Sequence, residues 1–80
     1  MNTKSLNALN TLTAQFPEIS EAFYAVTMYD SHINLQGNLS AKTLTITKAL
    51  GVTLSQHPEH LWFDGTTKVN GFRLDFCLTA

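Results

Sequence analysis

The segment over residues 72–78 contains the pattern that most limits how this chain can fold. Along it, the apolar residues Phe72, Leu74, Phe76 and Leu78 alternate with Arg73, Asp75 and Cys77. A strict period of two over a segment of this length is typical of a β-strand with one buried face. We therefore expect a sheet that other structure covers on one side, while its second side meets water or a partner.

Two segments with helical periodicity can supply that cover. In residues 4–16 an apolar stripe recurs at helical spacing, and Pro17 ends the segment. The stripe consists of Leu6, Leu9, Leu12 and Phe16. A second helix is expected between Ser40, a good N-cap, and Gly51, which suits the position after a helix end. Leu39 and Leu44 are spaced for a hydrophobic staple at its start, and we expect the buried side to include Leu44, Thr47 and Leu50.

The segment between the two helices predicts a hairpin. Residues 22–29 are rich in aromatic and β-branched side chains and favour a strand, although a helix over residues 19–25 also fits. Asp30 and Ser31 form a turn signal, and residues 32–36 alternate between apolar and polar side chains. An antiparallel pair of strands joined at this turn follows from the pattern.

The segment after Gly51 predicts further strands. Residues 52–55 alternate, residues 61–63 form a short apolar run, and Asp64 with Gly65 is a turn signal that leads into a loop over residues 66–71. The expected element order is α-β-β-α-β-β-β. We expect a single domain over residues 1–80 of the α+β class. It would be a two-layer sandwich, with both helices on one face of a mainly antiparallel sheet of about four or five strands.

The composition bears on the kind of partner. Charged residues make up 14% of the chain, against about 25% in an ordinary domain. Because the centres of protein interfaces are depleted in charge, a surface covered by a partner protein or by a second copy in a homodimer is favoured. A neutral, threonine-rich surface without a partner is the alternative. The net charge is −1 and the basic residues are scattered, which disfavours nucleic acid as a partner.

The chain also lacks the usual signals for export. Its first residues include no apolar leader, and no apolar run approaches the roughly 18 residues of a membrane span. Cys77 is the single cysteine, so no internal disulfide can form. We expect a cytoplasmic protein that does not bind membranes.

Residues with metal-ligand chemistry gather in one place only. His57, Glu59 and His60 lie close together, but Pro58 interrupts them, and a polar loop is the favoured interpretation.

Other reactive residues are isolated in the sequence. No basic residue adjoins Cys77 to lower its pKa, so a structural thiol is expected. Asp64 and Asp75 lie on neighbouring segments, where ordinary ion pairs with Lys68 and Arg73 are expected. The glycines form no phosphate-binding loop. We therefore expect no enzymatic activity, no metal and no cofactor.

Trp62 is the most informative candidate for binding. Leu61 and Phe63 flank it and are expected to face the core, which sends Trp62 outward. Tryptophan is enriched at the energetic centres of protein interfaces. The candidate binding residues are Trp62, Arg73, Tyr29, Phe23 and Asp75. The sequence leaves open whether the strand with Phe23 and Tyr29 shares the face of Trp62, because the register of the sheet decides this.

These features favour a small protein-binding domain that acts without catalysis, as an inhibitor or adaptor that occupies the surface of a partner protein. By analogy of size and composition alone, inhibitors encoded by phages or other mobile elements, for example against host defence, are proteins of this kind. Two alternatives remain open. One is a nucleic-acid-binding sheet face on which Trp62, Tyr24 or Phe23 stacks against bases. The other is a homo-oligomeric structural protein assembled through its edge strands.

Overall fold

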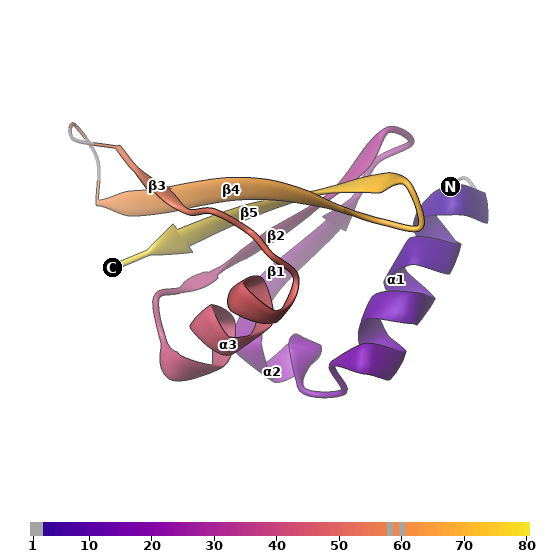
Figure 1. The fold of residues 1–80 in the computed structure, drawn as a ribbon, viewed down its shortest axis with the longest axis horizontal. Helices are drawn as coiled ribbons and strands as arrows, with labels where there is room; N and C mark the ends of the chain where they lie inside the picture. Colours follow the sequence, from indigo (N-terminus) through magenta and orange to yellow (C-terminus); the bar gives the residue numbers. More distant parts are fainter. Residues whose placement is uncertain (1–2, 58, 60) are drawn as a thin grey trace.

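A five-stranded sheet with helices on one side forms the molecule (Figure 1). The structure is a computed structural model that describes residues 3–57, 59 and 61–80. Within these residues the helices are α1 (Thr3–Gln15), α2 (Ile19–Ala22) and α3 (Ala41–Ala49). The strands are β1 (Phe23–Met28), β2 (His32–Asn38), β3 (Ser55–Gln56), β4 (Trp62–Val69) and β5 (Phe72–Thr79). The predicted α+β class is confirmed, with the short α2 as an added element.

The strand order explains how one sheet can be mainly antiparallel and still contain a parallel pair. The order across the sheet is β1-β2-β5-β4-β3. The hairpins β1–β2 and β4–β5 and the pair β3–β4 are antiparallel, whereas β2 and β5 run parallel. The C-terminal strand β5 thus lies at the centre of the sheet, with β2 and β4 as its neighbours.

The core lies between the helices and one face of the sheet. Ile33 and Leu35 of β2 and the alternating apolar residues of β5 pack there against Leu12 of α1 and Ile46 of α3. The expected stripes are confirmed at Leu12, Phe16 and Thr47, which are buried, but Leu6 and Leu44 are exposed. Ser5 and Thr43 are buried in addition to the expected residues. Small and hydroxyl-bearing side chains therefore form part of the buried side of both helices.

The start of α3 is the N-cap that the sequence predicts. The Ser40 hydroxyl accepts a hydrogen bond from the Thr43 backbone N–H, and the Thr43 hydroxyl accepts one from the Ser40 backbone N–H. Thr43 also donates its hydroxyl hydrogen to the Asn38 carbonyl oxygen at 2.7 Å, which joins the cap to the end of β2. This bond explains how a hydroxyl can be buried at that position. Leu39 and Leu44 both remain exposed, so the staple contributes little burial.

The boundary between α2 and β1 combines both predicted alternatives. Residues 19–22 are helical and the strand begins at Phe23. The register with β2 then shifts between Phe23 and Ala25, which marks a β-bulge at Tyr24. Because a bulge adds one residue to its strand, the faces of the residues before and after it no longer follow a simple period of two.

The predicted turn at Asp64 and Gly65 is wrong. β4 runs without interruption through both residues, and the chain turns instead at Asn70 and Gly71, whose φ angles are 54° and 76°. Positive φ at two successive residues is the requirement of the hairpin turn that Asn-Gly favours. Residues 66–71 are consequently strand and turn rather than loop.

Gly65 is needed for packing. A methyl group there would lie 2.6 Å from the Thr53 carbonyl oxygen and 2.5 Å from the Val52 Cγ1 atom. The segment after α3 therefore crosses directly over β4 at this residue. The strand predicted over residues 52–55 is reduced to the two residues of β3, which pair with Phe63 and Asp64.

Candidate binding surface on the open face of the sheet

The second face of the sheet is not covered by any of the three helices (Figure 1). The register places the outward residues of β5 beside those of β2 and β4. The central strands present His32, Asn34, Gln36 and Asn38 from β2, Arg73, Asp75, Cys77 and Thr79 from β5, and Trp62, Asp64, Thr66 and Lys68 from β4. Together with Tyr29 at the end of β1, we call these residues the open face.

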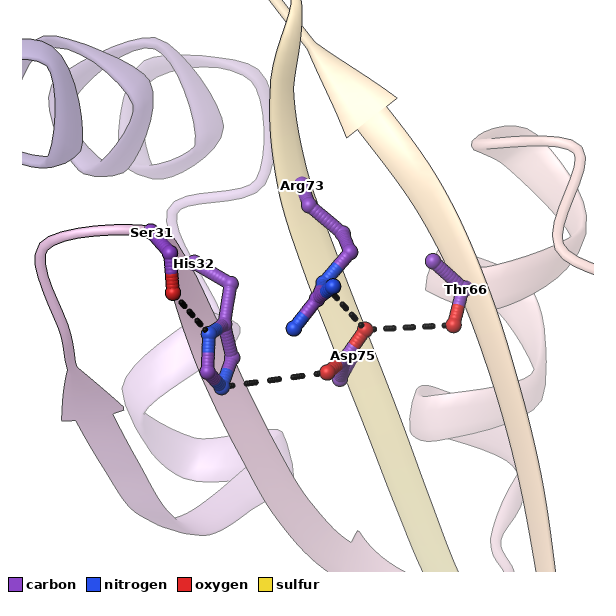
Figure 2. A network of polar contacts seen from close by, with 5 residues as sticks. All are labelled: Ser31, His32, Thr66, Arg73 and Asp75. Carbon is purple, nitrogen blue, oxygen red and sulfur yellow. Dashed lines mark hydrogen bonds and ion pairs between the residues drawn. The ribbon is translucent and has the colours of Figure 1, made fainter.

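A polar network with Asp75 at its centre ties three strands together (Figure 2). The Asp75 carboxylate accepts a hydrogen bond from the Thr66 hydroxyl at 3.1 Å and lies 3.3 Å from Arg73 Nε. His32 Nε2 lies 3.8 Å from the second carboxylate oxygen. The network therefore crosses from β2 through β5 to β4, and it holds the side chains of Arg73 and Asp75 in place.

Tyr29 extends this network to the edge of the sheet. Its ring stacks on the imidazole of His32, with 4.6 Å between ring centroids and an interplanar angle of 20°. The Ser31 hydroxyl lies 2.8 Å from His32 Nδ1, which holds the imidazole from its other side (Figure 2). The Tyr29 ring is thereby oriented although the residue is 49% exposed.

A second cluster surrounds Trp62 at the opposite end of the open face. His57 Nε2 lies 2.5 Å from an Asp64 carboxylate oxygen, and the His57 ring packs at 5.6 Å from the Trp62 ring. Trp62 is half-buried. The expectation that Leu61 faces the core is wrong: it precedes β4 and is 80% exposed. Leu61 thus adds apolar surface beside Trp62, while Phe63 faces the core side as expected because it pairs with Leu78.

A shallow depression of about 420 Å³ lies between the two clusters. Its lining includes Trp62, the amide-bearing residues Asn34 and Gln36, and the carboxylates of Asp64 and Asp75. Amides both donate and accept hydrogen bonds, whereas carboxylates only accept them. The depression can therefore receive a group that donates hydrogen bonds and also offers an apolar surface to Trp62.

Cys77 lies opposite Asp64 in the register and contributes to the same depression. Burial raises the pKa of the Cys77 thiol, and the negative charge of Asp64 raises it further as the smaller cause. A nucleophilic cysteine needs the reverse shift, because the thiolate is the reactive species. The thiol is thus held in its protonated form, in agreement with the expected structural role.

The possible metal ligands are only partly described by the structure. Pro58 and His60 lie outside the described residues, Glu59 is exposed and His57 is paired with Asp64. Among the described residues, no group of three histidine, cysteine, aspartate or glutamate side chains is placed to hold a metal ion.

The structure brings together most of the binding residues predicted from the sequence. Trp62, Tyr29, Arg73 and Asp75 all lie on the open face. Phe23 does not: it is 3% exposed and packs in the core at 5.7 Å from the Phe76 ring. The bulge at Tyr24 is the physical reason, because it places Phe23 on the opposite face from Tyr29.

The sequence alone does not identify several residues of this surface. The roles of His32 and Thr66 depend on pairing between strands that are distant in sequence, and no local signal marks them. The strict alternation of residues 32–36 did place His32, Asn34 and Gln36 on the outward side of their strand. His57 and Asp64 come together only because β3 pairs with β4.

No family model, curated protein or solved structure matches the chain. Within the described part of the chain, no helix combines the length and apolar content that crossing a membrane requires.

Proposed function

We propose that this chain is a small protein-binding domain that acts without catalysis, as an inhibitor or adaptor, by covering part of a partner protein with its open face. The observation that carries the proposal is the gathering of Trp62, Tyr29 and Arg73 on the one sheet face that the helices leave uncovered. These three residue types are enriched at the energetic centres of protein interfaces.

Pre-organisation of the side chains supports this proposal. Trp62 packs against His57, Tyr29 against His32, and Arg73 lies beside Asp75. Side chains that are already ordered lose less conformational entropy when a partner binds. Arg73 contacts Asp75 through its Nε atom. The terminal guanidinium nitrogens can donate hydrogen bonds to acceptors on a partner.

The charges on the open face favour a protein over a nucleic acid. Arg73 and Lys68 are accompanied there by Asp64 and Asp75, so both signs are present in equal number. Binding to a phosphate backbone depends on an excess of basic residues. Phe23, one of the aromatic residues considered for base stacking, lies in the core. A partner surface that is near neutral or of mixed charge fits this face better than a polyanion.

The proposal is tested by capturing the partner with Trp62→Ala beside the unchanged protein. Tagged protein is incubated with cell lysate, and captured proteins are identified by mass spectrometry. A stoichiometric partner should be captured by the unchanged protein, and Trp62→Ala should weaken the purified complex by about 2 kcal/mol or more, which exceeds a tenfold change in Kd.

Leu44→Ala is the matched control. Leu44 is an exposed apolar residue on α3, on the helix side of the sheet, and its truncation should leave binding unchanged. Circular dichroism establishes that both variants are folded. If Trp62→Ala is folded and binds the purified partner with the affinity of the unchanged protein, the open face is not the binding surface. Retained or lost activity of the partner in the complex then separates an adaptor from an inhibitor.

A further inference from the structure

The outer edge of β1 is a second surface with a distinct property. β1 is an end strand of the sheet and pairs with β2 alone, and its residues Phe23–Met28 include no charged side chain and no proline. Charges, prolines, bulges and very short strands are the usual means by which proteins prevent edge strands from pairing with other chains. The opposite edge strand, β3, has only two residues, whereas β1 has six.

The bulge at Tyr24 protects only the start of this edge. From Ala25 to Met28 the register with β2 is regular. The backbone N–H of Tyr29 donates to the His32 carbonyl oxygen at 2.8 Å, so these two residues form a hydrogen-bonded pair. Because hydrogen-bonded and non-hydrogen-bonded pairs alternate in an antiparallel ladder, the backbone groups of Val26 and Met28 point away from the sheet. They are correctly oriented to pair with another strand.

The side chains along this edge complement those of a second copy. A two-fold axis at Thr27 places Val26 opposite Met28 of the second copy, on the helix side of the sheet. On the other side it places Ala25 opposite Tyr29 and Thr27 opposite Thr27. Apolar side chains then meet apolar ones, a small side chain meets a large ring, and threonine meets threonine, which is a favourable cross-strand pair. No like charges face each other in this register.

We propose that β1 pairs antiparallel with β1 of a second copy, with the two-fold axis at Thr27, so that two chains share one continuous sheet. Val26 is 37% exposed and Tyr29 is 49% exposed, and both would be covered in part. The net charge of −1 per chain offers little repulsion between copies. The exchange of identical surfaces about a two-fold axis makes a closed dimer, because only the short β3 strands remain as outer edges.

The test measures molar mass by light scattering over a series from micromolar to millimolar protein. The mass should rise from 8.9 kDa towards that of two chains as the concentration increases. Val26→Lys places a charge at the pairing edge and should keep the protein at the mass of one chain throughout the series. Leu44→Lys adds the same charge to an exposed apolar position on α3 and should associate like the unchanged protein.

The register is tested by nuclear Overhauser effects in a mixture of labelled and unlabelled chains. A contact between the Ala25 methyl group and the Tyr29 ring of the other copy is expected. Within one chain these residues are four positions apart along an extended segment, at roughly 13 Å by the rise of a strand, so the signal can arise only between chains.

Two results would overturn the proposal: a mass of one chain at millimolar concentration, or association that Val26→Lys leaves unchanged. A dimer that lacks the contact between Ala25 and Tyr29 would overturn the proposed register. Because Val26 and Leu44 lie outside the open face, these outcomes are independent of the capture experiment with Trp62→Ala.

Discussion

At the scale of single residues, the clearest physical constraint concerns Cys77. Its thiol is placed opposite Asp64 on the open face, where burial and the neighbouring negative charge both disfavour the thiolate. The residue can therefore line the depression beside Trp62 without reacting readily with oxidants or electrophiles. The position of Cys77 in the sheet thus lowers the reactivity of its thiol.

The raised pKa of Cys77 predicts slow alkylation at neutral pH. The rate of reaction with iodoacetamide should reach its midpoint above the ordinary thiol pKa. Asp64→Asn should lower this midpoint, yet leave it above the ordinary value, because burial is the larger cause. An unchanged midpoint in Asp64→Asn would show that the charge of Asp64 does not act on the thiol.

The same raised pKa has a consequence for stability. The folded state disfavours the thiolate of Cys77. The stability that the protonated thiol contributes is therefore fully present below the ordinary thiol pKa, and it is lost as the pH rises through the pKa of Cys77 in the folded protein. The free energy of unfolding should thus fall in the alkaline range, and Cys77→Ser should reduce this part of the fall.

Gly65 predicts a packing defect on substitution. Gly65→Ala brings a methyl group against the Thr53 carbonyl oxygen, and we expect a loss of about 1–3 kcal/mol in the free energy of unfolding. Urea unfolding followed by tryptophan fluorescence measures it. Lys68→Ala, an exposed position on the same strand, is the control and should change stability by less than about 0.5 kcal/mol. Equal stability of Gly65→Ala and the unchanged protein would contradict the close approach of residues 52–53 to β4.

At the scale of elements, the two hairpins illustrate which local signals were sufficient. The hairpin β1–β2 was predicted from the turn at Asp30 and Ser31 and from the alternation that follows it. The hairpin β4–β5 was missed, although Asn70-Gly71 is the dipeptide that most favours a two-residue hairpin turn. Asp64-Gly65 is an equally good signal in isolation. Only the crossing of residues 52–53 over β4 shows why a glycine is required there within a strand.

The turn at Asn70 and Gly71 predicts a stability effect of its own. Gly71 has a φ angle of 76°, and Gly71→Ala should cost about 1–2 kcal/mol, because a Cβ atom disfavours this region. Thermal or urea unfolding checks the value. Asn70→Gly is the matched control, since glycine also accepts positive φ, and it should lose only the exposed hydrogen bond to Thr11. If alanine at position 71 left stability unchanged, the positive φ would not be a constraint.

At the scale of the whole molecule, the open face and the outer edge of β1 are two surfaces that can be used at the same time. A dimer formed through β1 with its two-fold axis perpendicular to the sheet would place all helices on one side and both open faces on the other. A partner with repeated binding sites would then be held by two faces at once, with a gain in overall affinity that needs no new contact. Tyr29, which lies at the boundary, would contribute to both surfaces.

The sequence by itself determined the class of the fold and the outward face of its best strand. The alternation in residues 72–78 and the cap at Ser40 are local signals. The structures that they predict do not depend on which distant segments of the chain pack against them. For the same reason, the outward positions of Trp62, Arg73 and Asp75 could be predicted.

Apart from the β1–β2 hairpin, only the tertiary structure decided which strands are neighbours. The parallel pairing of β2 with β5 brings His32 to Asp75, and the pairing of β3 with β4 brings His57 to Asp64. The bulge at Tyr24 moved Phe23 into the core. These outcomes depend on register, and a shift of one residue exchanges the two faces of a strand, so the packing of the core had to select among them.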